Sequence, residues 1–223
     1  MNNIANTYLF MDEVYTMLLD GTIDESMNRL FLELRKIKNN YSDQEWQDFS
    51  QKYCLLHPLK ELLHQDPFTF YSYQKPRGYA GDAALLDYIY YYYNCSESTT
   101  PLGAKIFNLT TKIPATHSVR TRRDILAATV DEIAAKANKP PRILSIACGH
   151  LREAQKSVAV QQGDIGELIA LDQDSLSITL LQKEQANNTI FPICNSVRNI
   201  LSKKLTFNNL DFVYAAGLYD YLN

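Results

Sequence analysis

The sequence has little of what marks several common protein classes. It has four cysteines in 223 residues, widely scattered, with no CxxC motif and no Cys/His spacing typical of a zinc site. This argues against a zinc site and against a disulfide framework. No apolar run approaches the roughly 20 residues that span a bilayer. The N-terminal stretch MNNIANTYLFMDEVY lacks the basic region of a signal peptide. We therefore expect a cytoplasmic protein with no membrane span and no bound metal.

An excess of basic charge is also missing. The formal net charge is −3, so there is no general electrostatic reason to expect nucleic acid or an anionic membrane as a partner. The one dense basic stretch, RTRRD at 120–124, is by itself typical of a solvated helix face. The composition does provide 46% hydrophobic residues, which is ordinary for a globular protein with a core.

The first part of the chain has the signals of helices. Thr22 with Glu25, and Ser42 with Glu45, have the spacing of capping boxes. A long amphipathic pattern covers roughly 116–137 and ends at NKPP, because a residue before proline is pushed out of the helical region. This part of the sequence predicts a helical region.

The pattern changes after these prolines. Four short segments rich in Ile, Leu, Val and Phe follow, namely RILSIA, ELIALD, TIFPIC and LDFVYAAG. Two helical patterns, HLREAQKSVAVQQ and DSLSITLLQKEQAN, separate the first three. Continuous apolar strands alternating with helices predict a parallel sheet covered on both faces. The sequence therefore predicts an α/β protein, with a helical N-terminal or lid region over residues 1–138 and the opening of a doubly wound, Rossmann-like domain over residues 139–223.

The turn after the first of these strands, in RILSIACGHLREA, is the candidate ligand loop. Dinucleotide enzymes need G-x-G-x-x-G there, and of those glycines only Gly149 is present. This favours a cofactor without a pyrophosphate. Asp172 ends the second strand, where a carboxylate can bind ribose hydroxyls, although an acid at this place is also a common helix cap. Asn195 and Ser196 follow the third strand, where an amide and a backbone N–H could read an adenine edge.

Several segments together resemble a known family. ILSIACGHLREA, LIALDQDSLSITLL, FPICNSVRNIL and LDFVYAAGLYDYL look like the successive motifs of class I S-adenosyl-L-methionine-dependent methyltransferases. LHQDPFTFYSYQKPRGYAGDAALLDYIY and HSVRTRRDIL narrow the resemblance to the bacterial extracellular-factor family, which is associated with 3-hydroxy fatty acid methyl esters. The resemblance implies a methyltransferase that O-methylates the carboxylate of a small or fatty-acid-like acceptor, with S-adenosylmethionine as methyl donor.

The resemblance also implies where the donor binds. Ala147, Cys148 and Gly149 would line the methionine and ribose side of the donor, and Asp172 would bind its ribose. Asn195, Ser196 and Val197 would border the adenine. Ala216 and Gly217 would face the transferring methyl. The chain departs from the general pattern at three positions. Ser145 stands where an acid is common, and Ala147 and Leu151 replace glycines.

The acceptor side carries no clear catalytic residue. A fatty acid carboxylate is already ionised at neutral pH, so its methylation needs no general base. Candidates for holding the acceptor are Arg77, Tyr79 and Tyr219, with Arg120 or Arg122 as alternatives for its head group and the tyrosines of 88–93, Leu218 and Tyr221 for an apolar lining. The structural alternatives stay open: tyrosines and leucines at this spacing fill helix–helix cores, and Asp82 after KPRGYAG is the N-cap of a helix.

The family's sheet continues beyond a fourth strand, whereas this sequence stops just after LDFVYAAG. Three interpretations follow: a truncated chain, a homodimer that covers the open edge of the fourth strand, or a non-catalytic remnant. The alternative function is thus a degenerate methyltransferase-fold module with a binding or regulatory role. A nicotinamide oxidoreductase ranks below both, because the loop has too few glycines.

Overall fold

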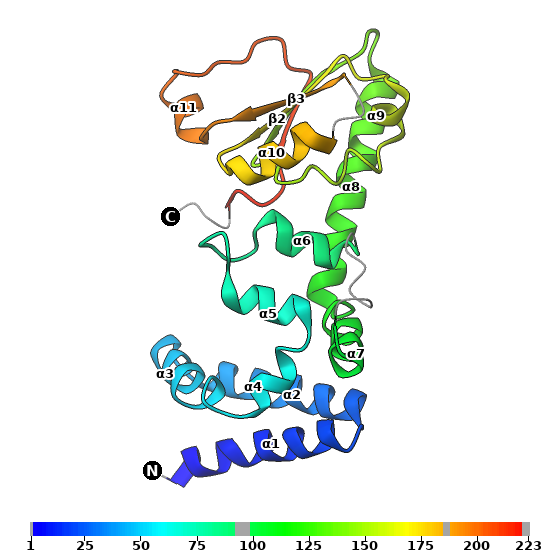
Figure 1. The fold of residues 1–223 in the computed structure, drawn as a ribbon. Coiled ribbons are helices and arrows are strands. Elements are labelled where there is room, and N and C mark those ends of the chain that lie inside the picture. Colours follow the sequence, from blue (N-terminus) through cyan, green and yellow to red (C-terminus); the bar gives the residue numbers. More distant parts are fainter. Residues whose placement is uncertain (1, 92–98, 185–187, 220–223) are drawn as a thin grey trace. The chain divides into compact units, whose positions relative to one another are not determined.

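The computed structural model describes residues 2–91, 99–184 and 188–219. They form two compact units (Figure 1). The first unit comprises Met1–Gly81 and Asp87–His117, and the second comprises Asp82–Leu86 and Ser118–Asn223. The predicted break after residue 138 marks the change from helices to strands, whereas the compact units divide within helix α8, Pro114–Lys136.

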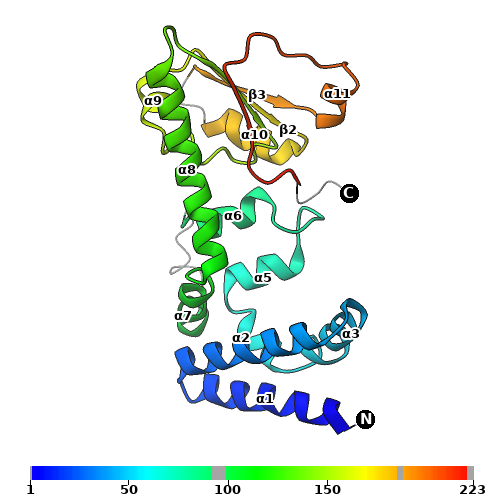
Figure 2. The same cartoon turned by 180° about the vertical axis from the view of Figure 1, so that it is seen from behind.

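The first unit is helical. Its helices are α1 (Asn2–Leu19), α2 (Ile23–Asn40), α3 (Asp43–Phe49), the π-helix η1 (Ser50–Cys54), α4 (Leu59–Leu63), α5 (Pro67–Gln74) and α7 (Pro101–Thr110). Helices α1 and α2 lie side by side and antiparallel in both views (Figures 1 and 2). One core holds this unit together, with buried members Phe10, Met11, Val14, Leu18, Ile23, Met27, Leu30, Phe49, Leu59 and Ile106. No helix within the described ranges is long and apolar enough to cross a membrane.

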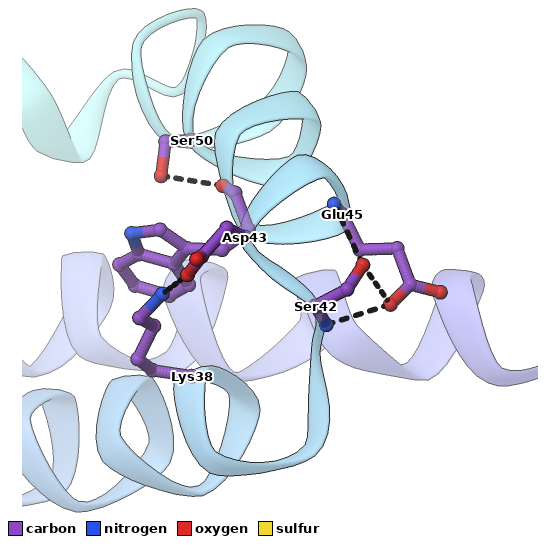
Figure 3. Close-up of polar contacts among 6 residues, drawn as sticks. Lys38, Ser42, Asp43, Glu45 and Ser50 are labelled. Atoms are coloured by element: carbon purple, nitrogen blue, oxygen red, sulfur yellow. Dashed lines mark hydrogen bonds and ion pairs between the residues drawn. The ribbon is translucent and has the colours of Figure 1, made fainter.

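Helix α3 begins as its sequence predicts. The Ser42 hydroxyl accepts the backbone N–H of Glu45 at 3.3 Å, and the Ser42 N–H donates to the Glu45 carboxylate at 2.8 Å. Lys38 at the end of α2 adds an ion pair to Asp43 at 2.7 Å (Figure 3). The capping box at Ser42 is therefore confirmed.

The capping box predicted at Thr22 and Glu25 is wrong. Thr22 precedes α2, but its side chain caps no N–H of that helix. Its hydroxyl donates instead to the carbonyl of Met17 in α1, at 3.0 Å. Gly21 lies between the two helices with φ +84°, and this tight turn leaves the Thr22 hydroxyl close to the carbonyls at the end of α1.

The second unit contains the predicted parallel sheet. Its strands are β1 (Arg142–Ile146), β2 (Glu167–Asp172), β3 (Ile190–Cys194) and β4 (Phe212–Ala215), all parallel and in the order β3-β2-β1-β4. The α/β class and the parallel sheet are thus confirmed. The helices between the strands are α9 (Val158–Gln162), α10 (Ser175–Glu184) and α11 (Val197–Leu201).

The two faces of the sheet are covered unequally. Helices α8, α9 and α10 contribute to one apolar core with Ile143 and Leu168 of the sheet. On the opposite face Leu144 packs in a second cluster, to which Ile200 of α11 contributes. Phe191 of β3 and Val213 of β4 lie in register on this second face, and their exposed fractions are 44% and 47%. The expected cover is complete on the first face and partial on the second.

The helix predicted over 150–162 is wrong in its first two thirds. The described backbone there turns without forming a helix, and α9 begins only at Val158. Leu151 has φ +49°, a value that a right-handed helix excludes. Asp131 of α8 fixes the later start, because its carboxylate accepts the backbone N–H of Ala159 at 2.9 Å.

Candidate functional site

The loop that follows β1 has an unusual backbone. Ala147, Gly149 and Leu151 have φ values of +53°, +54° and +49°. For a residue with a side chain this left-handed conformation costs roughly 1–2 kcal/mol, and only glycine adopts it freely. Every second residue of the loop thus has the conformation of a glycine, although only one is a glycine. Strain of this kind persists where the surroundings fix the backbone, and it is common at functional sites.

Asp172, at the carboxyl end of β2, holds this loop. Its Oδ2 accepts the N–H of Gly149 at 2.8 Å, and its Oδ1 accepts the N–H of Asp174 at 2.8 Å. The N–H of Cys148 donates to the carbonyl of Leu171 at 3.1 Å. Asp172 is 9% exposed. Each of its oxygens retains a second lone pair with which it could accept a ligand hydroxyl.

The helix after β2 is capped by Asp174 and not by Asp172. Asp174 accepts the N–H of Leu176 at 3.0 Å and the hydroxyl of Ser177 at 2.9 Å, so it caps the first turn of α10. The contacts of Asp172 go to the loop after β1 and to the N–H of Asp174. In doubly wound folds a carboxylate about twenty residues after the first turn binds the ribose of a cofactor.

The second unit also supplies a wall to this loop. Helix α6 (Ala83–Ile89) begins within it, and a Cβ placed on Gly149 would lie 3.0 Å from the Cβ of Ala83. Asp82 is 2% exposed and its Oδ1 accepts the N–H of Leu85 at 2.9 Å. The prediction that Asp82 caps a helix is confirmed. Gly149 is needed both for its φ and for this close approach.

The predicted adenine residues lie at the start of α11. The N–H of Asn195 donates to the carbonyl of Asp172 at 2.8 Å, which brings it next to the loop. Its side-chain oxygen accepts the N–H of Ser196 at 2.8 Å and the amide of Asn199 at 2.6 Å. Ser196 is the N-cap of α11, and Val197 is its first residue. These contacts give Asn195 and Ser196 structural roles, and their contact with adenine stays a prediction.

The remaining predicted residues are spread over both units. Ala216 and Gly217 follow β4 and are half-buried, and a Cβ added to Gly217 would meet no atom within 4 Å. Tyr219 is 76% exposed. Arg77 and Tyr79 are half-buried in the turns between α5 and α6, in the first unit. The structure therefore brings together, beside β1 and β2, the loop residues 147–149 with Asp172 and Asn195.

The described part of the tyrosine-rich segment packs within the first unit. Tyr88 contacts Tyr71 with ring centroids 5.5 Å apart, and Tyr88 and Tyr91 lie edge-on to Phe107. This is the aromatic packing of a helical core. Tyr92, Tyr93 and Tyr221, also predicted candidates for the lining, lie outside the described residues.

Sequence reasoning did not identify a buried polar pair behind the loop. The hydroxyl of Tyr214, in β4, donates to the Glu153 carboxylate at 2.8 Å. Burial raises the pKa of the Glu153 carboxyl, and burial, together with the neighbouring Glu153 charge, raises that of the Tyr214 phenol. The only signals in the sequence were a charged pair in LRE and a tyrosine in an apolar strand.

Cys148 lies in the loop but is unsuited to act as a nucleophile. Burial, and then the charges of Asp172 and Glu153, raise the pKa of its thiol, so it stays protonated at neutral pH. Both acids are thus near enough to Cys148 to affect the pKa of its thiol. Across the described ranges, no group of three or more His, Cys, Asp or Glu side chains could hold a metal ion.

No protein-family model matches the chain, and no curated protein or solved structure matches it either. The family resemblance therefore rests on its motifs alone.

Proposed function

We propose that this protein binds S-adenosylmethionine at the loop after β1 and transfers its methyl group to a carboxylate of a small, fatty-acid-like acceptor. The observation that carries the proposal is the hydrogen bond from the Gly149 N–H to the Asp172 carboxylate. It joins the ends of two adjacent parallel strands at the place where doubly wound folds bind ligands. The left-handed backbone of Ala147, Gly149 and Leu151 supports the same conclusion.

The residues present fit such a donor. Asp172 is fixed by two backbone N–H groups and can still accept the ribose hydroxyls. Gly149 has no side chain to occupy the space at the turn, and the Ala83 wall lies on one side of it. The negative charge of the Asp172 carboxylate beside the loop suits a sulfonium cation.

The chemistry asks little of the protein. When bound, the donor supplies an electrophilic methyl, which a carboxylate oxygen attacks in line. A C–O bond forms, the S–C bond breaks with its electron pair going to sulfur, and the products are a methyl ester and a thioether. No proton moves, so the chain has to align the reactants and exclude water. For this reason catalysis would not require an acid–base pair in the loop.

Titration calorimetry with S-adenosylhomocysteine tests the donor site. We expect the wild type to bind, and Asp172→Asn to bind at least about tenfold more weakly, because its amide N–H₂ would face the N–H of Gly149 or Asp174. Asp164→Asn is the matched control, since Asp164 is an exposed aspartate of the same unit. No heat with the wild type, or equal affinity in all three proteins, would contradict the assignment.

A radiolabel-transfer assay tests the acceptor. The label of S-adenosylmethionine carrying a tritiated methyl should pass to a 3-hydroxy fatty acid and not to the corresponding diol, which lacks the carboxylate. Label on both would reject the carboxylate as the nucleophile. Label on neither, together with donor binding, would favour the second candidate.

The second candidate is a methyltransferase-fold module that binds a partner without turnover. The exposed apolar side chain of Val213, on the edge strand β4, favours it, because an exposed apolar edge strand is a site for pairing with another chain. The open edge of β4 also leaves room for a homodimer. Sedimentation velocity of wild type and Val213→Lys would show whether that edge associates.

A further inference from the structure

Glu153 and Tyr214 form a buried contact between two distant parts of the chain. They are 61 residues apart in sequence, and the Tyr214 hydroxyl donates to Glu153 Oε1 at 2.8 Å. Glu153 is 9% exposed and Tyr214 is 7% exposed. A buried carboxyl that has left water needs such a partner. The bond therefore fixes the place of Glu153 relative to the sheet.

The sheet in turn fixes Tyr214. It is the register partner of Ser145 in β1, which is 1% exposed. The ring of Tyr214 stacks on that of Phe212, with centroids 5.5 Å apart. Ser145 also lies two residues before Ala147, where the loop begins. Tyr214 thus connects the beginning of the loop, through Ser145, with its end, through Glu153.

The turn between Gly149 and Glu153 is anchored on both sides. Leu151 is 2% exposed with φ +49°. Arg152 Nη1 contacts Glu184 of α10 at 2.6 Å, and Glu153 contacts Tyr214 of β4. Successive side chains are therefore held by two different elements. These anchors account for the absence of a helix in a segment whose apolar pattern predicts one.

We propose that Glu153 and Tyr214 are a positioning pair, which holds the turn after Gly149 and thereby keeps the Gly149 N–H on the Asp172 carboxylate. The pair acts on the backbone and need not touch a ligand. Its meaning for catalysis rests on the proposed function, since the same backbone would receive the methyl donor. Its structural claim, that the pair sets the environment of one amide, is independent of any ligand.

Two measurements on wild type and variants test the pair. The first is the ¹H–¹⁵N resonance of Gly149, which reports its bond to Asp172 without a ligand. The second is calorimetric affinity for S-adenosylhomocysteine. Tyr214→Phe removes the hydroxyl and keeps the ring, and we expect it to shift the Gly149 amide resonance and to weaken binding by about tenfold. Glu153→Gln retains an oxygen that can accept the same bond, and we expect it to bind within about threefold of wild type.

Matched controls separate positioning from a general loss of structure. Tyr41→Phe removes a tyrosine hydroxyl in the first unit, and Glu132→Ala removes an exposed glutamate of α8. Neither should move the Gly149 resonance or the affinity. Thermal unfolding and far-ultraviolet circular dichroism show whether Tyr214→Phe is folded. Glu153→Gln is the conservative variant, and it should retain the wild-type Gly149 resonance and affinity.

The outcomes separate this inference from the proposed function. An unchanged Gly149 resonance in folded Tyr214→Phe overturns the positioning pair, whether or not the protein binds the donor. So does binding of Tyr214→Phe with the wild-type affinity. A shifted resonance with no binding by the wild type would instead support the pair and reject the methyltransferase proposal.

Discussion

The helix starts of the first unit and the loop after β1 in the second unit reach their backbone conformations in different ways. In the first unit, helices begin where the local sequence has a capping residue, as at Ser42, Asp66 and Thr100. In the second unit, Ala147 and Leu151 adopt conformations that their own side chains disfavour. There the backbone is set by contacts between residues far apart in sequence. Local and global preferences disagree at functional sites more often than elsewhere, and this difference directs attention to the loop after β1.

The largest expected effect on stability is in the first unit. Asp66 is fully buried, and it accepts the N–H of Phe68 at 2.9 Å and the hydroxyls of Thr69 and Thr110 at 2.6 and 2.9 Å. Asp66→Ala should lower the free energy of unfolding by about 3 kcal/mol, because it removes a helix cap and leaves buried donors without partners. The fluorescence of Trp46, the one tryptophan of the chain, reports this unit in urea titrations.

The control for this prediction is another aspartate of the same unit. Asp48 pairs with Lys52 on the exposed side of α3, and Asp48→Ala should change stability by no more than about 0.5 kcal/mol. Equal destabilisation by the two variants would contradict the view that the cap network of Asp66 stabilises the unit.

The second prediction sharpens the comparison at the loop itself. Gly149→Ala should destabilise the protein by about 2 kcal/mol and weaken donor binding, because the new Cβ meets both a positive φ and the Cβ of Ala83 at 3.0 Å. Gly163→Ala is the matched control, since Gly163 has φ +80° but no atom within 4 Å of an added Cβ. Denaturation followed by circular dichroism measures both.

The comparison would fail if Gly163→Ala were as damaging as Gly149→Ala. The cost at 149 would then come from the backbone conformation alone, and the wall formed by Ala83 would be of no consequence. Donor binding by Gly149→Ala with the wild-type affinity would show that the close approach of Gly149 to Ala83 is not needed for binding.

The third prediction compares two similar sequence signals. Ser42→Ala removes a complete capping box and should cost about 1 kcal/mol. Thr22→Ala removes a hydroxyl that caps no N–H, so it should cost less than about 0.5 kcal/mol. Trp46 fluorescence during unfolding again measures both. A larger loss for Thr22→Ala would show that its bond to the carbonyl of Met17 matters more than the cap.

The last prediction concerns the dependence of stability on pH. Burial raises the pKa of both Asp66 and Glu153, so the folded protein holds these protons more tightly than the unfolded chain. Their contribution is fully present below the unfolded pKa of about 4 and is lost as pH rises through the folded pKa. The slope is at most about 1.4 kcal/mol per pH unit for each group.

Amide variants assign this slope to each unit. Asp66→Asn should flatten the pH dependence of the unfolding followed by Trp46 fluorescence, which reports the first unit. Glu153→Gln should flatten the pH dependence of the part of the circular dichroism transition that does not coincide with the fluorescence change. An unchanged slope in both variants would show that the two carboxyls titrate alike in the folded and unfolded chain.

The sequence was sufficient for much of the fold. Strand patterns such as ELIALD and the proline break at NKPP predicted the parallel sheet and the end of α8, because continuous apolar runs and prolines act locally. The turn at 150–157 could not be predicted from the sequence, because Arg152 contacts Glu184 and Glu153 contacts Tyr214. No local pattern encodes contacts over such separations.

The candidate site was predictable in the same uneven way. Gly149 and Asp172 could be identified from their positions after two predicted strands, and the structure joins them. The wall at Ala83 could not, because nothing in the sequence relates residue 83 to residue 149. Asn195 and Ser196 were predicted for a ligand and are engaged as the start of α11, since a polar residue after a strand serves a helix equally well.

The bond between Glu153 and Tyr214 has a consequence for the order of events during synthesis. The ribosome adds Tyr214 61 residues after Glu153, at about 5–20 residues per second. For several seconds the nascent chain therefore contains β1, β2 and the turn between them but not β4, whose Tyr214 donates the hydrogen bond to Glu153. A newly made chain should form the bond between Glu153 and Tyr214 only once β4 has left the exit tunnel, later than the helices that precede it have folded.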